Sequence, residues 1–237
     1  MTVLLGLSTP GYPRSSAMRG RRVSSRDIGG LLFLILYKFA IMDLMNNNKP
    51  LNFILIGRSG SGKGTQAELL AKKFKDLIHI STGELMRDLT KRDTEVGVKI
   101  KKILEKGGLP FDDMATTLWM HEIAFSVKKD QGIICDGFPR RVNEAQNLDR
   151  FFEWLGRNEN TKVLEIDISR EEAFTRLKKR ARGIDDNDEA INGRLSYFEE
   201  RVVPVINFYK ERGQLIHING EQSVEDVFKE IIAKIND

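Results

Sequence analysis

The sequence predicts an α/β domain in which a parallel sheet of five strands is covered by helices on both faces, as a three-layer sandwich. Five apolar runs rich in Ile, Leu and Val recur along the chain, at residues 51–56, 77–80, 132–135, 162–168 and 214–218. Each has the length of a strand and is bounded by turn-forming residues, as is typical of strands buried on both faces. Helical patterns separate the runs, and this alternation favours parallel strands joined by helical crossovers.

Apolar residues between the strands recur at helical spacing, so that each set lies on one face of a helix. The clearest sets are Ala67, Leu70, Ala71 and Phe74; Val96, Ile100, Ile103 and Leu104; and Leu195, Phe198, Val202, Ile206 and Tyr209, with a bend expected at Pro204. Three helical segments follow one another within residues 82–130, which is more than one crossover requires, and they predict a helical insertion. Ser223 and Asp226 match a capping box at the start of the last helix.

The composition is that of an ordinary globular protein. The 237 residues are 41% hydrophobic and 30% charged, which suits one large α/β domain. The net charge of +4 arises in residues 1–50, which hold seven basic and two acidic residues, whereas the rest of the chain holds 31 basic and 32 acidic residues. The charge therefore predicts no nucleic-acid partner. The single cysteine, Cys135, excludes a disulfide framework and a multi-cysteine zinc site, and it favours a reducing, cytoplasmic location.

Residues 1–49 form an atypical N-terminal extension. They are rich in Arg and Ser up to Asp27, and an apolar stretch that contains Lys38 follows at 29–42. A membrane-spanning helix needs about 20 apolar residues, so no stable span is expected. Three interpretations stay open: a targeting peptide, an extension that is disordered, packed or in contact with a membrane, and upstream sequence read from a wrongly assigned start, with Met42 or Met45 beginning the protein. We favour the last.

A glycine-rich loop follows the first predicted strand, in the segment LNFILIGRSGSGKGTQAELL. Glycines fall at 57, 60, 62 and 64, and Lys63 stands where a helix begins. Such a loop turns successive backbone N–H groups into one concavity, and the helix N-terminus adds partial positive charge, so that phosphate groups bind there. Lys63 can reach the β- and γ-phosphates of a nucleotide. Gly64 stands where such loops usually carry Ser or Thr, and Thr65 follows one position later. The strand–loop–helix context predicts a P-loop NTPase fold.

Further motifs resemble those of the adenylate kinase family and follow one another in the same order and at the same spacing. The resemblance extends from about residue 50 to the C-terminus. They are GKGTQ at 62–66, STGELMR at 81–87, DGFPR at 136–140 and, more loosely, RARGIDD at 180–186 followed by Arg194. GKGT together with DGFPR is specific to nucleoside monophosphate kinases. The resemblance implies one domain over 50–237, in which the insertion at about 81–110 binds the acceptor and a short lid covers about 181–187. This lid lacks the subdomain and zinc cysteines of long-lid members, so no structural zinc is expected.

The resemblance implies reversible, Mg²⁺-dependent transfer of a phosphoryl group from ATP to AMP, giving two ADP. The residues expected to bind ATP are Gly60, Ser61, Gly62, Lys63, Gly64, Thr65, Arg176 and Gln222. Those expected to bind AMP are Thr82, Gly83, Arg87, Gly108, Leu109, Pro110, Gly137, Arg140 and Glu144. Those expected to be catalytic are Lys63, Arg140, Arg180 and Arg194. Asp136 is expected to hold Mg²⁺ through water, and Phe138–Pro139 is expected to be a cis peptide. Arginines suit this chemistry because their planar forks match phosphate oxygens in a loose, charge-rich transition state.

Two departures from the family pattern affect these expectations. Glu144 stands where adenylate kinases usually carry a Gln that reads the acceptor adenine, and a carboxylate accepts hydrogen bonds but cannot donate to adenine N1. Gln146 could take over this role if the helix register differs. Thr82 favours AMP, since pyrimidine-specific relatives typically have Ala there. A lid arginine is replaced by Gly183, and Arg182 is its candidate substitute.

We therefore expect a monomeric enzyme with ATP and AMP as substrates. The alternative is a UMP/CMP or broad-specificity nucleoside monophosphate kinase, and a non-catalytic nucleotide-binding protein is less favoured. Other polar and aromatic residues are interpreted structurally: His79, His121 and His217 as packing or surface histidines, Trp119 and Trp154 as packing residues, and Asp185 and Asp186 as helix caps.

Overall fold

The computed structural model describes residues 50–236, except 107, 109 and 181–186. Five parallel strands form one sheet in the order β2-β3-β1-β4-β5. The strands are β1 (Asn52–Ile56), β2 (Leu77–Ser81), β3 (Gly132–Asp136), β4 (Thr161–Asp167) and β5 (Leu215–Asn219). All five predicted strands are confirmed, each to within about a residue of the expected ends.

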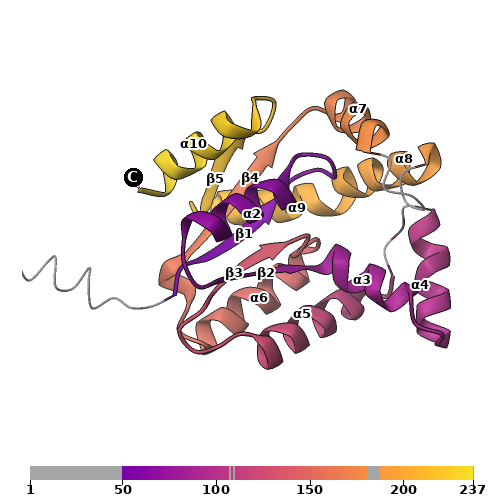
Figure 1. Cartoon of the computed structure of the whole chain (residues 1–237), viewed down its shortest axis with the longest axis horizontal. Helices are drawn as coiled ribbons and strands as arrows, with labels where there is room; N and C mark the ends of the chain where they lie inside the picture. The colour runs from indigo at the N-terminus through magenta and orange to yellow at the C-terminus, as the bar shows by residue number, and fades with distance from the viewer. Residues whose placement is uncertain (1–49, 107, 109, 181–186, 237) are drawn as a thin grey trace, which may run out of the picture. The chain divides into compact units, whose positions relative to one another are not determined.

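Helices lie between the strands and after the last one (Figure 1). They are α2 (Lys63–Lys73), α3 (Thr82–Thr90), α4 (Glu95–Glu105), α5 (Asp112–Ser126), α6 (Val142–Trp154), α7 (Arg170–Arg180), α8 (Asp188–Tyr197), α9 (Val203–Glu211) and α10 (Val224–Asn236), with a short 3₁₀ turn at Asn158–Asn160. The three helices α3, α4 and α5 follow one another between β2 and β3, which confirms the predicted helical insertion. Within the described ranges, no helix combines the length and the apolar character that crossing a bilayer would take.

The core has two layers because successive side chains of a strand point to opposite faces of the sheet. On β1, Phe53 and Leu55 pack with α2 and α10, whereas Ile54 and Ile56 pack with α5, α6 and α9. Figure 1 shows the same division, with α2 and α10 on one side of the sheet and α5 and α6 on the other. The predicted fold class, an α/β three-layer sandwich with a five-stranded parallel sheet, is confirmed.

Some of the helical faces predicted from the sequence match the side chains that are buried in the structure better than others do. Leu195 and Tyr209, at the two ends of the predicted α8–α9 face, are buried, and a π-helical turn at Phe198–Val202 separates the two helices. Pro204 lies in the first turn of α9, where its missing N–H costs little. The α4 face is shifted, since Ile100 is buried but Val96 is 43% exposed.

Two helix starts show how local hydrogen bonds fix the element boundaries. The N-cap half of the expected capping box is confirmed, because Ser223 Oγ accepts from the Asp226 backbone N–H, and the same hydroxyl donates to Oδ2 of Asp226. At α8 the cap is Asn187, whose Oδ1 accepts from the Ala190 N–H at 2.8 Å. The expected caps Asp185 and Asp186 lie outside the described residues.

The two tryptophans differ from each other. Trp119 is fully buried and its ring stacks on Phe138, with centroids 5.4 Å apart. Trp154 is 79% exposed, so its interpretation as a packing residue is wrong. Trp154 ends α6, and its ring lies 5.9 Å from that of Phe151.

Candidate functional site

The glycine-rich loop joins the end of β1 to the start of α2. Gly60 and Gly62 have φ angles of +88° and +94°, which residues other than glycine rarely adopt. Gly62 is the N-cap of α2, and the helix begins at Lys63. The first N–H groups of a helix have no intrahelical partner, so this loop presents donors and a positive helix end to one point.

Lys63 folds back over the loop. Its Nζ donates to the carbonyl oxygens of Gly57 and Arg58, both at 2.8 Å, and lies 3.4 Å from Ser61 Oγ. Burial lowers the pKa of Lys63 to about 8, although the carboxylate of Asp136 opposes this shift. An anion placed at the loop would favour the charged form of this lysine.

One cavity of about 680 Å³ gathers most of the predicted site residues. From the expected ATP site it is lined by Gly60, Gly62, Lys63, Gly64, Thr65, Arg176 and Gln222. From the expected AMP site it is lined by Thr82, Gly83, Arg87, Gly108, Pro110, Gly137, Arg140 and Glu144. Asp136, Arg180 and Arg194 line it as well. Ser61 is buried under the loop beside Lys63 instead, and Leu109 lies outside the described residues.

Gly137 holds two side chains of the expected AMP site in place. Its carbonyl oxygen accepts from Thr82 Oγ1 at 2.7 Å and from Arg140 Nε at 2.6 Å. Its φ is +78°, and a Cβ at this position would lie 2.9 Å from Thr82 Oγ1 and 3.0 Å from an Arg140 guanidinium nitrogen. Glycine is therefore required here, and the Arg140 guanidinium is fixed by the chain that carries it. The expected cis peptide between Phe138 and Pro139 is confirmed.

Glu144 is 4% exposed, and both of its oxygens accept hydrogen bonds from the protein. Oε2 accepts from the Arg140 backbone N–H at 2.7 Å, and Oε1 accepts from the Trp119 indole N–H at 3.2 Å. Burial raises the pKa of Glu144, and these two donors act against the shift. Sequence reasoning missed this role of Trp119, which was interpreted as a packing residue only. No local signal links α5 to α6 at this point.

Asp136 ends β3, and His79 lies on the neighbouring strand β2. His79 Nε2 is 3.3 Å from Asp136 Oδ2, and both residues line the cavity. Burial acts to lower the pKa of His79, but the hydrogen bond and the charge of Asp136 outweigh it and raise the pKa. Burial acts to raise the pKa of Asp136, but His79 and Lys63 lower it, so the carboxylate is ionised. Sequence reasoning interpreted His79 as an ordinary packing or surface histidine and did not foresee this contact with Asp136.

Three arginines reach the cavity from α7 and α8. Arg176 Nε donates to Glu172 Oε1 at 2.6 Å, one turn earlier on α7, and Arg180 ends the same helix. Arg194 lies in α8, where its Nε donates to the Ala190 carbonyl at 3.3 Å. The question of whether Arg182 substitutes at Gly183 falls outside the described residues.

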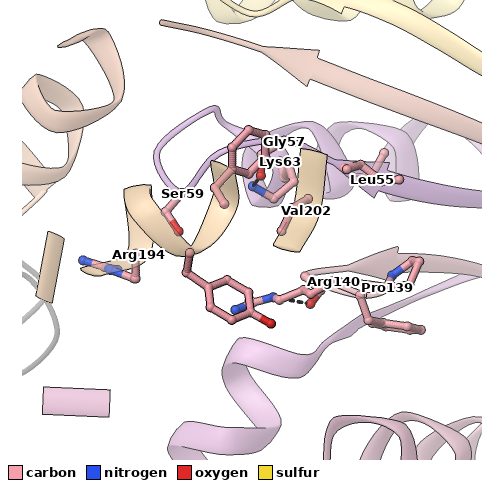
Figure 2. Close-up of a pocket in the computed structure, with 13 residues that line it drawn as sticks. Leu55, Gly57, Ser59, Lys63, Pro139, Arg140, Arg194 and Val202 are labelled. Carbon is pink, nitrogen blue, oxygen red and sulfur yellow. Dashed lines mark hydrogen bonds between the residues drawn. The ribbon is translucent and has the colours of Figure 1, made fainter. Parts of the chain in front are cut away.

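A smaller cavity of about 50 Å³ adjoins the loop (Figure 2). Lys63 from the start of α2, Arg140 from the segment after β3 and Arg194 from α8 all line it. Tyr197, which sequence reasoning did not single out, lines it too. Three cationic side chains around one small space favour an anion with several oxygens, such as a phosphoryl group.

Comparison with known proteins agrees with this geometry. The family model described as adenylate kinase matches residues 55–214. An adenylate kinase of Phocaeicola vulgatus is 36% identical over 188 residues, which cover 78% of this chain and 98% of that protein. One of Nautilia profundicola is 36% identical over 76% of this chain and 93% of its own length, and one of Nitratiruptor sp. is 37% identical over 74% and 90%. The chain belongs to the adenylate kinase family.

Proposed function

We propose that the chain transfers a phosphoryl group between ATP and AMP, with the donor at the glycine-rich loop and the acceptor between Thr82 and Glu144. The observation that carries this proposal is that residues of both sets line the same cavity of about 680 Å³. The relatives named above, each called adenylate kinase, support the same reaction. They do not favour the pyrimidine or the non-catalytic alternative.

In the donor half, the N–H groups ahead of α2 bind the phosphates of ATP. Lys63 exchanges its contacts with the carbonyls of Gly57 and Arg58 for the β- and γ-phosphate oxygens. Arg176 and Gln222 contact the adenosine end of the donor. Arg176 is held by Glu172, and the Gln222 amide donates to Glu230 Oε2 at 2.6 Å, so both side chains are positioned by neighbours.

In the acceptor half, Arg87 and Arg140 hold the phosphate of AMP. Its attacking oxygen is already ionised at neutral pH, so no general base is needed. Arg180 and Arg194 stabilise the charge that spreads over the moving phosphoryl group, which is the main contribution a protein makes to this reaction. The Arg140 guanidinium is already oriented before the acceptor binds, because its Nε donates to the Gly137 carbonyl.

The residues present fit a magnesium ion held through water. Magnesium prefers oxygen ligands and keeps several of its waters, and the Asp136 carboxylate is ionised and lines the cavity beside the loop. A Cβ at Gly64 would lie 3.7 Å from Asp136 Oδ2, so the first turn of α2 faces this carboxylate. When bound, the ion neutralises charge on the β- and γ-phosphates. Asp136 would orient its water shell.

A coupled assay for ADP tests the proposal with AMP, GMP, CMP, UMP and dTMP as acceptors. We expect turnover with AMP and at most weak turnover with the others. Lys63→Ala should lower kcat by about a hundredfold or more, by analogy with the loss of other fixed charge donors. Preferred turnover of UMP or CMP would contradict the choice of acceptor, and tight ATP binding without turnover would contradict an enzyme.

We also propose that residues 50–237 suffice for this activity, as a cytoplasmic monomer. The P-loop, the acceptor residues and the arginines all lie in this range, and the single Cys135 suits a reducing compartment. A chain trimmed to residues 50–237 should keep full kcat and elute as a monomer in size-exclusion chromatography with light scattering. Loss of activity in that chain would assign a role to the first residues.

A further inference from the structure

Tyr197 lies one helical turn after Arg194 on α8 and lines the small cavity that Lys63, Arg140 and Arg194 also line. Its hydroxyl oxygen is buried and, within the described part of the chain, has no hydrogen-bond partner. Buried polar groups in folded proteins are almost always paired, and an unpaired one lowers the stability of the fold. An exception of this kind calls for an explanation.

The surroundings of Tyr197 decide what its hydroxyl can bind. Arg140 and Arg194 line the same small cavity, and the Arg141 guanidinium carbon lies 5.8 Å from the Tyr197 ring centroid. Guanidinium groups have no acceptor, so the hydroxyl cannot donate to any of these arginines. Glu144 is the nearby carboxylate, but its hydrogen bonds come from Trp119 and the Arg140 backbone, and none joins it to the Tyr197 hydroxyl. The hydroxyl is therefore a donor without an acceptor, in a place surrounded by cations.

Burial also keeps this hydroxyl protonated. It raises the pKa of Tyr197 above that of an ordinary tyrosine, and the neighbouring arginines offset only part of the effect. The group is thus an O–H donor at every pH at which the enzyme would work. Its natural partner is an anionic oxygen that enters the cavity with a ligand.

We propose that the Tyr197 hydroxyl donates a hydrogen bond to a phosphate oxygen of the acceptor nucleotide, beside Arg140. This inference rests on the proposed function, which places the acceptor phosphate at Arg140. In this arrangement the acceptor phosphate is bound by Arg87 and Arg140 and also by the hydroxyl, whose direction is fixed by its burial. The hydroxyl takes no part in proton transfer and acts on acceptor binding alone.

The test is Tyr197→Phe, which keeps the ring next to Arg141 and removes only the hydroxyl. We expect the KM for AMP and its calorimetric Kd to rise about tenfold, as for loss of a hydrogen bond to a charged group. The KM for ATP should stay within about twofold. The free energy of unfolding of the nucleotide-free protein should stay the same or increase, because an unpaired buried hydroxyl has been removed.

Tyr209→Phe is the matched control. The Tyr209 hydroxyl is also buried, but it donates to Asp149 Oδ1 at 3.0 Å, between α9 and α6. Its loss should lower stability and leave the Kd for AMP unchanged, which is the opposite of the pattern expected for Tyr197→Phe. An unchanged affinity for AMP in Tyr197→Phe, or an equal loss of affinity for AMP and ATP, would overturn the inference. A wild-type protein that makes no ADP would overturn the proposed function instead.

Discussion

The indole N–H of Trp119 donates to Oε1 of Glu144 at 3.2 Å, and this bond ties the acceptor site to helix α5. The other carboxylate oxygen accepts from the Arg140 backbone N–H. Glu144 lines the cavity, and its carboxylate holds the backbone of Arg140 in place. Glu144, which replaces the Gln expected at this position, is therefore paired with Trp119 from another helix.

Trp119→Phe should leave Glu144 Oε1 without its donor while keeping the aromatic contact with Phe138. We expect the free energy of unfolding to fall by about 1–3 kcal/mol, the cost of a buried acceptor left unpaired. Urea denaturation measures this. A second substitution, Glu144→Gln, in the same background should recover part of the loss, because a neutral amide is less costly to bury than a carboxylate. Equal stability of Trp119→Phe and wild type would show that the bond contributes nothing.

Glu144→Gln alone should sharpen the preference for AMP. An amide can accept from adenine N6 and donate to N1, whereas a carboxylate accepts only and suits the adjacent N–H donors of guanine. We expect the ratio of kcat/KM for AMP to that for GMP to rise about tenfold, measured in the coupled assay. An unchanged ratio would mean that Glu144 does not face the acceptor base.

Arg140→Lys should lower kcat/KM by about a hundredfold, although the charge is retained. A lysine cannot donate through Nε to Gly137 while presenting a fork to the acceptor phosphate. Arg150→Lys is the matched control, because Arg150 is an exposed arginine on α6 that bonds to Asn147. Comparable activity of the two variants would remove Arg140 from the phosphate site.

Gly137→Ala should disrupt the acceptor half, since the new Cβ would lie within 3.0 Å of both Thr82 and Arg140. We expect a loss of about 1–3 kcal/mol in unfolding free energy and a marked rise in the KM for AMP. Gly156→Ala is the control, with φ +69° and nothing within 4 Å of the added Cβ. It should show the backbone strain without the kinetic defect, so a matching rise in KM would indicate a general folding effect.

His79→Gln should change how stability depends on pH. The pKa of His79 is raised, so its stabilising pair with Asp136 is fully present below about pH 6 and is lost as the pH rises through the folded-state pKa. The pKa of Asp136 is lowered, so its own contribution is lost only in acid, as the pH falls through the folded-state pKa. The stability difference between wild type and variant should therefore shrink, by about 1 kcal/mol or less, between about pH 6 and pH 8. Nucleotide-free urea denaturation across this range measures it, and a constant difference would contradict the pairing.

The elements that could be predicted are those whose signal is local. The strand β1 and the loop after it are specified by consecutive residues, through burial on both faces and through glycines at positive φ. The helical insertion followed from three amphipathic segments in a row. The roles of Arg87 and Arg140 came instead from the resemblance of their motifs to the adenylate kinase family. In the fold these motifs follow β2 and β3, which end side by side at one edge of the sheet.

What the sequence could not supply were contacts between residues far apart in the chain. Trp119 and Glu144 are 25 residues apart, and His79 and Asp136 are 57 apart. Each pair joins two elements whose relative rotation depends on the packing of the whole core. The unpaired Tyr197 hydroxyl was equally hidden, since only the folded chain shows which polar atoms lack a partner. Exposure of Trp154 was missed because helical spacing alone does not show where the core ends.

The most direct test is a calorimetric titration with two adenosines joined through five phosphates, a single molecule that spans both nucleotide positions. The account predicts one molecule bound per chain, displaced by ATP and by AMP, with affinity reduced both by Lys63→Ala and by Arg140→Lys. Absence of binding, or displacement by only one of the two nucleotides, would contradict the claim that donor and acceptor share this cavity.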